Sequence, residues 1–295
     1  MIETDGLKCL GPEGRGPWRL GNDRLLRTST DMVPLRAETD AQAVFDTYHA
    51  ARLAGAPSPD ALEVVRVADG YGVVVEYIAG LPLGTHLLFG SYSIEMAGHT
   101  MGVLARKLHS MHMGAGRDWN ALFAQRAREL STLMAPQAGN QLVSLVEMIP
   151  PSDALIHGDL HVVNVVVLDG ECHLIDMELA GYGHPTFDLA IARSRLIGAA
   201  NDATVNARLG RDVSERVWRR IWRALLESYF EDASESTLDD LDQRFEVLAQ
   251  IELCRQLCAD YRSDADSLND GQRRRLAESI QRIEELLPHI TRLDF

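Results

Sequence analysis

One stretch of the sequence gathers most of the side chains that can do chemistry. It contains the spacing His157-x-Asp159-x₄-Asn164, and Asp176 follows twelve positions later. Phosphoryl transfer from a nucleotide needs such a set: hard oxygen ligands for Mg²⁺, and a carboxylate that orients the acceptor hydroxyl and takes its proton. These residues therefore favour nucleotide-dependent phosphotransfer with Asp159 as the base.

A tight hairpin is predicted to bring the oxygen ligands together. Asp169-Gly170 is a preferred two-residue turn, and it is flanked by the strand-like runs Asn164–Leu168 and Glu171–Asp176. In this register Asn164 is diagonal to Asp176, and diagonal cross-strand neighbours lie roughly 7–8 Å apart or less. An ideal strand would point the two side chains to opposite faces. The prediction therefore requires the backbone to bend at the strand ends.

The first eighty residues predict a small antiparallel sheet that carries one helix. Strand-like runs lie at Arg24–Arg27, Leu62–Val67 and Tyr71–Ile78, and turn residues separate the last two. Between the first two runs, Glu38–Leu53 carries apolar side chains at helical spacing. Segment 11–16 is rich in glycine but lacks the spacing of a phosphate-binding loop, so it is interpreted as a turn.

The sequence changes to long helical patterns after Gly80. Ile94–Met111 and Trp119–Met134 are predicted helices, and two further apolar stripes begin at Trp218 and Leu276. Stripes of this kind usually face a core. A boundary near residue 80 is therefore predicted, with one lobe over residues 1–80 and a larger helical lobe over residues 81–295.

Composition narrows the function classes and the compartment. The formal charge of −14 disfavours nucleic acid and anionic membranes as partners, since both attract clustered Lys and Arg. It is compatible with a cationic substrate, and equally with an acidic surface that only keeps the protein in solution. The four cysteines form no CxxC pair, and neither a signal peptide nor a membrane-spanning run is recognisable. A cytoplasmic protein is expected.

Several motifs resemble the aminoglycoside phosphotransferase and choline kinase superfamily. The loop reads His157-Gly-Asp159, and Ile-Asp176-Met-Glu stands where a protein kinase has Asp-Phe-Gly. Gly181–Ala190 is similar to the superfamily's Gly-x-Pro-x-x-Asp-Leu-Ala run. The resemblance is closest to a bacterial branch that reads Ile-Asp-Met. Val74–Gly80 resembles the superfamily's hinge, and Leu108–Met111 its Leu-His pair, so the likeness covers residues 15–195.

The resemblance implies a fold and a set of roles. The fold is α+β: a bilobal, protein-kinase-like arrangement of a small antiparallel sheet with one helix, which binds nucleotide, and a mostly helical catalytic and substrate-binding lobe. Asp159 would be the base, and Asn164 and Asp176 would bind Mg²⁺. The backbone of Glu76 and Ile78 would bond the adenine of ATP or the base of GTP. A small-molecule kinase is thus expected.

Other residues would support these roles. His157 and Asp188 resemble residues that brace the catalytic loop. The superfamily has a phosphate-binding lysine on its third strand, where this chain has Arg27, since its only lysines are Lys8 and Lys107. Arg27 is either the replacement or a surface residue. The acidic partner of the clamp is expected on the following helix, where there are three candidates: Glu38, Asp40 and Asp46.

The acceptor is the least determined part. Related enzymes line the acceptor site with carboxylates, and weaker candidates here are Glu178, Glu252 and Asp260. Most other acidic residues of the C-terminal helices are interpreted as solvated. The resemblance allows an aminoglycoside or another antibiotic, with resistance as the biological role. A nucleoside or an amino alcohol is equally compatible.

Two alternatives stay open at this level. The alternation His157-x-Asp159-x-His161, together with Asp176, could bind zinc or iron in a metallohydrolase. The missing lysine is compatible with a nucleotide-binding protein whose catalysis is impaired. Nucleotide turnover separates the second alternative from an active phosphotransferase.

Overall fold

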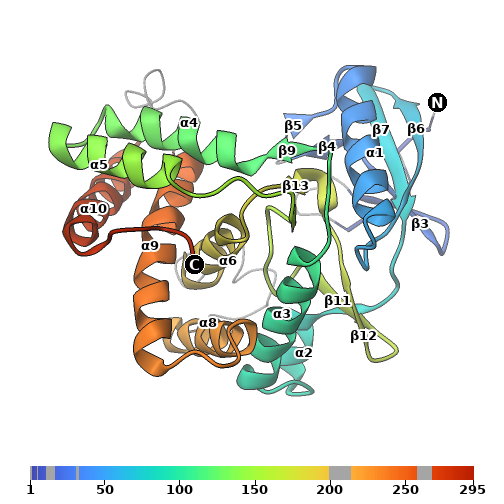
Figure 1. Ribbon diagram of the computed structural model, residues 1–295. Helices are drawn as coiled ribbons and strands as arrows, with labels where there is room; N and C mark the ends of the chain where they lie inside the picture. Colours follow the sequence, from blue (N-terminus) through green and yellow to red (C-terminus); the bar gives the residue numbers. More distant parts are fainter. Residues whose placement is uncertain (1, 5, 11–16, 31–32, 199–213, 258–267) are drawn as a thin grey trace.

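The computed structural model describes residues 2–4, 6–10, 17–30, 33–198, 214–257 and 268–295. The glycine-rich segment 11–16 and Asp260 lie outside this part of the chain. Figure 1 shows a sheet with one covering helix beside a larger body of helices, and the hairpin β11–β12 lies below the sheet. This is the predicted α+β arrangement.

The N-terminal part is a five-stranded antiparallel sheet. In sheet order its strands are β1 (Lys8–Cys9), β2 (Trp18–Leu20), β3 (Arg24–Arg27), β7 (Gly70–Glu76) and β6 (Ala61–Val67). A two-stranded sheet of β4 (Ser29–Thr30) and β5 (Val33–Pro34) follows β3. Helix α1 (Glu38–Leu53) has the bounds expected from its spacing, and it packs on β6 and β7. Its buried residues Ala41, Val44, Tyr48 and Ala51 repeat every three or four positions, which is the period of a helix face.

The chain leaves this sheet directly after β7. The short strand β8 (Leu81–Pro82) no longer pairs with β7 but with β11 (Val165–Leu168), in which Val167 faces Leu81. The backbone thus passes from one part to the other within residues 77–80. We therefore propose the lobe boundary at residue 80.

The rest of the chain is mostly helical. Its helices are α2 (Leu83–Phe89), α3 (Ile94–His109), α4 (Trp119–Ser131), α5 (Pro136–Glu147), α6 (Thr186–Gly198), α8 (Glu215–Tyr229), α9 (Glu235–Leu257) and α10 (Asp270–Leu286), with short 3₁₀ turns at Met177–Leu179 and Leu287–His289. This part also contains two three-stranded sheets. The first has the strand order β12 (Glu171–Leu174), β11, β8. The second has the strand order β10 (Leu155–Ile156), β13 (Gly181–Tyr182), β9 (Arg117–Asp118). None of the described helices is long and apolar enough to cross a bilayer.

Helices α3 and α8 pack closely because α3 carries glycine at the contact. A Cβ at Gly98 would meet the carbonyl oxygen of Ile221 and lie 2.6 Å from the Cβ of Ala224. One turn on, a Cβ at Gly102 would lie 2.5 Å from the carbonyl oxygen of Leu225. Two glycines four residues apart therefore form the strip of α3 on which α8 rests.

The close contact between α3 and α8 predicts that a methyl group added at Gly98 destabilises the fold. Gly98→Ala should lower the free energy of unfolding by about 1–3 kcal/mol, because added atoms in a close-packed contact force the helices apart. Gly114→Ala is the control, since no atom lies within 4 Å of a Cβ built there. Urea titrations of both variants make the comparison. Equal stabilities for the two would contradict the close packing of α3 on α8.

Candidate active site

The hairpin β11–β12 forms in the register expected from its turn. Asp169 and Gly170 both have positive φ, 51° and 83°, which is the geometry of a two-residue hairpin turn. Strand β12 ends at Leu174, and Asp176 has a left-handed backbone with φ of 63°. Such a conformation is uncommon for a residue other than glycine, and it clusters at functional sites. The required bend at the strand end is therefore present.

The catalytic loop is held by the buried carboxylate of Asp188, on α6. It accepts hydrogen bonds from the backbone N–H groups of His157 at 2.9 Å and of Gly158 at 3.0 Å. The ring of His109 lies 3.1 Å from the same carboxylate, and Tyr229 contacts the other ring nitrogen at 2.9 Å. Burial opposes the charged form of Asp188, but the hydrogen bond and charge of His109 hold its pKa below the usual value. Asp188 is thus an ionised brace.

The loop also needs the glycine at its middle position. Gly158 has φ of +82°, and a Cβ there would meet the ring of Trp119 and lie 2.8 Å from the carbonyl oxygen of Leu179. A side chain would be both strained and obstructed. The packing of Trp119 therefore explains why this loop reads His-Gly-Asp where protein kinases have arginine.

His157 uses both ring nitrogens inside the protein. Its Nδ1 accepts from the backbone N–H of Asp159 at 3.1 Å, so Nε2 donates to the carbonyl oxygen of Ile175 at 3.0 Å. It therefore links the loop to the strand end that precedes Asp176. This pairing leaves no nitrogen for a metal, and the described residues contain no group of three or more His, Cys, Asp or Glu placed to hold one. The geometry does not support a metallohydrolase.

Asp159 lies among positive and hydrogen-donating groups. The side-chain amide of Asn164 donates to the carbonyl oxygen of Asp159 at 2.9 Å and to its Oδ2 at 3.0 Å. Nε of Arg195 is 2.6 Å from Oδ1, and Nε2 of His161 is 3.4 Å from Oδ2. Burial favours a neutral carboxyl, but His161 and then Arg195 outweigh it, so the pKa of Asp159 lies well below its usual value. Asp159 is ionised at neutral pH.

Arg27 points from β3 into this site and is buried. Its Nη1 contacts Oδ1 of Asp176, and its Nη2 lies 2.6 Å from Oε1 of Glu178. The hydroxyl of Tyr48, on α1, donates to Oε2 of Glu178 at 3.2 Å. Burial disfavours the charged guanidinium, but the carboxylates hold the pKa of Arg27 well above its usual value. Burial raises the pKa of Glu178 to about 7. The positive charge of Arg27 opposes this rise, and the negative charge of Asp176 adds to it.

The acidic partner of Arg27 is therefore not on the following helix, and that prediction is wrong. Asp40 instead accepts from the backbone N–H of Ala37 at 3.2 Å, and Asp46 accepts from Gln42 at 2.8 Å. Glu38 is exposed. Helix α1 contributes Tyr48 in place of a carboxylate, and the acid comes from Glu178 in the C-terminal part. The apolar-looking stripe of α1 gave no signal that its tyrosine would serve this cluster.

The predicted hinge residues lie at the end of the sheet. Glu76 is the last residue of β7, and its N–H donates to the carbonyl oxygen of Asp60 at 3.0 Å. Tyr77 donates to the carbonyl oxygen of Asp23 at 2.7 Å. Within the described part of the chain the N–H of Ile78 has no hydrogen-bond partner. The backbone of Ile78 is thus able to donate to a ligand at the hinge.

The weaker acceptor candidates are not alike. Glu178 lies in the Arg27 cluster. Glu252 is buried in α9, where it pairs with Arg126 at 2.7 Å and with Arg255 at 2.8 Å, so packing accounts for it. Asp260 lies outside the described residues. The contact of Arg195 with Asp159 was not foreseen, although Arg195 follows Asp188 by seven positions, which is two turns of one helix face.

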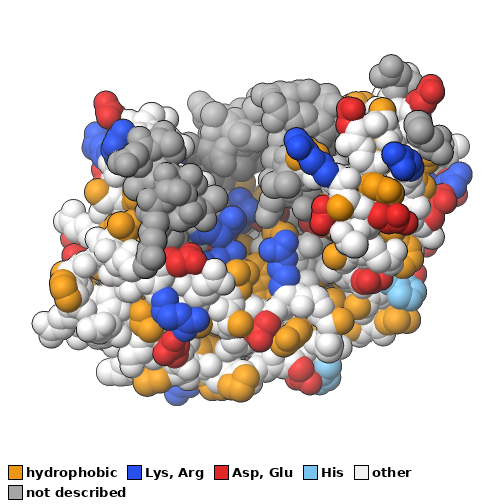
Figure 2. Space-filling model, turned by 90° about the horizontal axis from the view of Figure 1, so that it is seen from above, with side chains coloured by type: hydrophobic (Ala, Val, Ile, Leu, Met, Phe, Trp, Pro, Cys, Tyr) orange, Lys and Arg blue, Asp and Glu red, His pale blue; other side chains and the backbone are white. Residues whose placement is uncertain are grey.

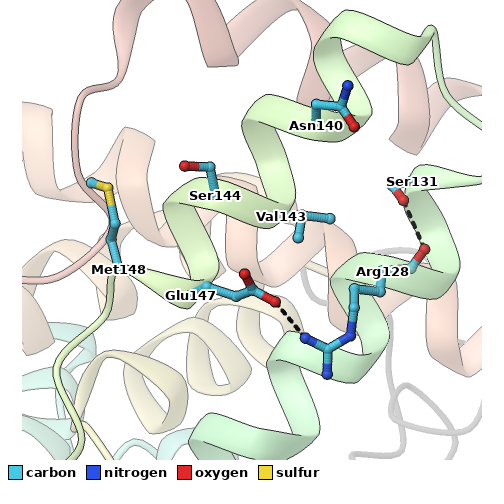
Figure 3. Close-up of a pocket in the computed structure, with 7 residues that line it drawn as sticks. All are labelled: Arg128, Ser131, Asn140, Val143, Ser144, Glu147 and Met148. Carbon is cyan, nitrogen blue, oxygen red and sulfur yellow. Dashed lines mark hydrogen bonds and ion pairs between the residues drawn. The ribbon is translucent and has the colours of Figure 1, made fainter.

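A separate groove lies on the surface between α4 and α5 (Figure 3). It has a volume of about 590 Å³, and its lining includes the ion pair of Arg128 with Glu147 and the side chains of Val143 and Met148. None of the predicted site residues lines it. The hairpin and the catalytic loop, rather than this groove, carry the candidate chemistry.

Comparisons with known proteins agree with this fold. Three of the solved structures that share it illustrate the likeness. A choline/ethanolamine kinase family protein from Mesorhizobium loti is 19% identical (TM-score 0.59; 96% of this chain and 88% of that chain covered). A mutant aminoglycoside 2'-phosphotransferase-IIIa bound to GDP is 14% identical (TM-score 0.56; 98% and 93%). An amicoumacin kinase in complex with AMP-PNP, Ca²⁺ and Ami is 15% identical (TM-score 0.54; 98% and 92%). A search of curated proteins found no match.

The fold is that of a kinase-like protein. The family model described as "Phosphotransferase enzyme family" matches residues 16–227, which is more than half of the sequence. The chain belongs to the phosphotransferase enzyme family, so it is a small-molecule phosphotransferase by class.

The brace at Asp188 makes a prediction for stability and its pH dependence. Asp188→Asn should lower the free energy of unfolding by about 3–5 kcal/mol at neutral pH, because it breaks a buried charged network. The pKa of Asp188 is lowered in the folded state, so its contribution is present above the unfolded pKa and is lost as the pH falls. The gap between parent and variant should therefore shrink towards acid.

Denaturant titrations at several pH values provide the measurement. Asp153→Asn is the matched control, since Asp153 also pairs with a histidine, His112, at 3.0 Å, but both side chains are 72% exposed. The control should change stability by no more than about 1 kcal/mol. A loss of equal size in both variants would contradict the bracing role of Asp188.

Proposed function

We propose that this protein transfers a phosphoryl group from ATP or GTP to a hydroxyl of a small molecule. The observation that carries the proposal is that Asp159, Asn164 and Asp176 lie at one hairpin end. Asn164 bonds Asp159, and its backbone carbonyl oxygen accepts from the N–H of Ile175, the residue before Asp176, which Arg27 contacts. Each group has the chemistry that one part of phosphoryl transfer requires.

The nucleotide would lie between the hinge and Arg27. The N–H of Ile78 and the carbonyl of Glu76 would bond the base. Arg27 would bind the phosphates, since a guanidinium offers paired planar donors to phosphate oxygens. The bound nucleotides of the amicoumacin kinase and the aminoglycoside 2'-phosphotransferase, AMP-PNP and GDP, support a nucleoside triphosphate here.

The donor atoms present fit a magnesium ion. The amide nitrogen of Asn164 is spent on Asp159, which leaves its oxygen for a cation. The side chain of Asp176 is 35% exposed, and the arginine contact uses Oδ1. Mg²⁺ usually takes one or two protein carboxylate ligands and otherwise phosphates and water. When bound, it would neutralise charge on the phosphates.

Asp159 would act on the acceptor hydroxyl. Its lowered pKa makes it a weak base but a constant hydrogen-bond acceptor, so it would orient the hydroxyl first and take the proton late in the transfer. His157 and Asp188 hold it in place. An aminoglycoside or another antibiotic stays a prediction for the acceptor, with resistance as a role, and the cysteine pattern supports a cytoplasmic site of action.

Impaired catalysis is the second candidate function, and one observation favours it. Arg27 contacts the proposed metal ligand Asp176 directly, so metal and arginine compete for that carboxylate. An arginine that kept the contact would block turnover while nucleotide still bound. Turnover above that of a dead variant excludes this candidate.

The base is tested with one substitution. Asp159→Asn should keep nucleotide affinity roughly unchanged and lower turnover by about 10²–10⁴-fold, the range for a positioned general base. Coupled detection of nucleoside diphosphate release measures turnover, and calorimetry measures affinity. Near-normal turnover in this variant would remove Asp159 from the mechanism.

The clamp is tested with a pair of variants. Arg27→Met should raise the apparent KM for nucleotide and lower kcat, because a phosphate contact that strengthens in the transition state contributes to both. Arg27→Lys should recover part of the loss. Arg24→Met is the control, because Arg24 lies on the same strand but is exposed. Unchanged nucleotide dependence in Arg27→Met would refute the clamp.

A further inference from the structure

Arg195 is fixed beside the proposed base by the same helix that braces the loop. It lies on α6 two turns after Asp188, and α6 is buried along most of its length. Nε of Arg195 is 2.6 Å from Oδ1 of Asp159, and neither atom forms a hydrogen bond of good geometry within the described residues. The contact is thus an ion pair without a well-aligned hydrogen bond, and it does not use the two outer nitrogens of the guanidinium.

The outer nitrogens of Arg195 have no acceptor in the described part of the chain. The side chain is 29% exposed, and its ion pair with Asp159 is made through Nε. Arg193, two positions earlier, differs: it contacts both Asp242 at 2.6 Å and Glu246 at 3.0 Å. Arg193 is therefore neutralised by two carboxylates, whereas the only carboxylate that Arg195 contacts in the described part of the chain is that of Asp159.

The carboxylates that would recognise a cationic acceptor are largely engaged. Six acidic residues of the C-terminal helices and the turn between them pair with arginines of this chain: Glu231 with Arg106, Glu235 and Asp239 with Arg223, Asp240 with Arg244, Asp242 with Arg193, and Glu252 with Arg126. Figure 2 shows Lys and Arg side chains in the hollow at the middle of the face seen from above. Despite the net charge of −14, the base thus has a cation, Arg195, in direct contact with it.

We propose that the acceptor carries an oxyanion, a carboxylate or a phosphate, next to the hydroxyl that is phosphorylated, and that Arg195 binds this oxyanion. The inference rests on the proposed phosphotransferase function. A planar guanidinium beside the base would offer paired donors to the oxyanion, and the hydroxyl would then lie at Asp159. A cationic amino group at the same place would be repelled by the charge of Arg195.

The reaction would balance as an ordinary transfer. The acceptor oxygen forms a bond to the γ-phosphorus, and the bond from that phosphorus to the β–γ bridging oxygen breaks. The acceptor proton passes to Asp159. The products are a phosphate monoester that still carries its oxyanion, and a nucleoside diphosphate. Arg195 takes no part in bond making and is a specificity residue.

The test uses acceptors that differ only in charge. Glycerol, ribose and glucose skeletons, each as the acid, the phosphate, the neutral compound and the amine, are assayed for nucleoside diphosphate release and for binding in the presence of ADP. Parent protein should prefer the acid or the phosphate of one skeleton over its neutral form. The acid and phosphate arms identify which oxyanion is used.

Variants assign the preference to Arg195. In Arg195→Gln the ratio of kcat/KM for the anionic acceptor to that for the neutral one should fall about 10- to 100-fold, the size of a hydrogen bond to a charged group. Arg195→Lys should retain part of the ratio, and Arg195→Glu should favour the amine. If Arg195 acted only through the pKa of Asp159, its replacement would lower kcat/KM equally for all acceptors and leave the ratio unchanged. Arg128→Gln, in the α4–α5 groove, is the control and should leave the ratio unchanged.

The outcomes separate this inference from the function on which it rests. Transfer to an amine in preference to its anionic counterpart, an unchanged ratio in Arg195→Gln, or a panel with no anionic member bound or phosphorylated would overturn the inference. The first two of these would leave the phosphotransferase function standing. Absence of both nucleotide binding and nucleotide turnover would instead overturn the proposed function itself.

Discussion

The buried carboxylate of Asp188 is the interaction on which the site depends. It is ionised without exposure to water, so it must be satisfied by donors, and it takes them from the backbone of His157 and Gly158 and from the ring of His109. This demand fixes the catalytic loop to α6. Because Arg195 lies on the same helix, the brace also sets the distance between Asp159 and the charge beside it.

A second constraint comes from burying a guanidinium. Arg27 has almost no exposed surface, and it is held by two carboxylates that both belong to the run after β12. The contact joins strand β3 of the N-terminal sheet to the run after β12. In the proposed function, the phosphates of the nucleotide would replace Asp176 as the partner of Arg27, and Asp176 would turn to the cation. The buried charge is thus both a link between the two parts and a cost to be overcome on binding.

Much of the scaffold followed from local rules. The Asp-Gly turn set the hairpin register, and the spacing of apolar residues gave α1 its observed bounds, because both depend on neighbours in sequence. The residues that surround Asp159 and Arg27 could not be predicted from such local rules. Which acid meets Arg27 depends on how the run after β12 packs on β3, about 150 residues away, so a carboxylate on α1 was expected and Tyr48 was found.

The same limit applies to the acceptor side. Most acidic residues of the C-terminal helices were interpreted as solvated, because a sequence does not show which arginines reach them. In the fold most are paired with arginines, and a cation lies next to the base instead. The net charge of the chain therefore did not indicate the sign of the charge beside the base. The Arg195–Asp159 contact carried one faint signal, its two-turn distance from Asp188.

We propose that Asp176 and Asn164 hold a divalent cation for a nucleotide at this hairpin. Calorimetric titration of ATP into the protein, with Mg²⁺ and again with EDTA, tests it most directly. The account predicts saturable binding with Mg²⁺ that weakens at least about tenfold when the metal is removed, because loss of one charge-assisted contact costs about 1.4 kcal/mol or more. Equal affinity in the two titrations, or no binding in either, would contradict it.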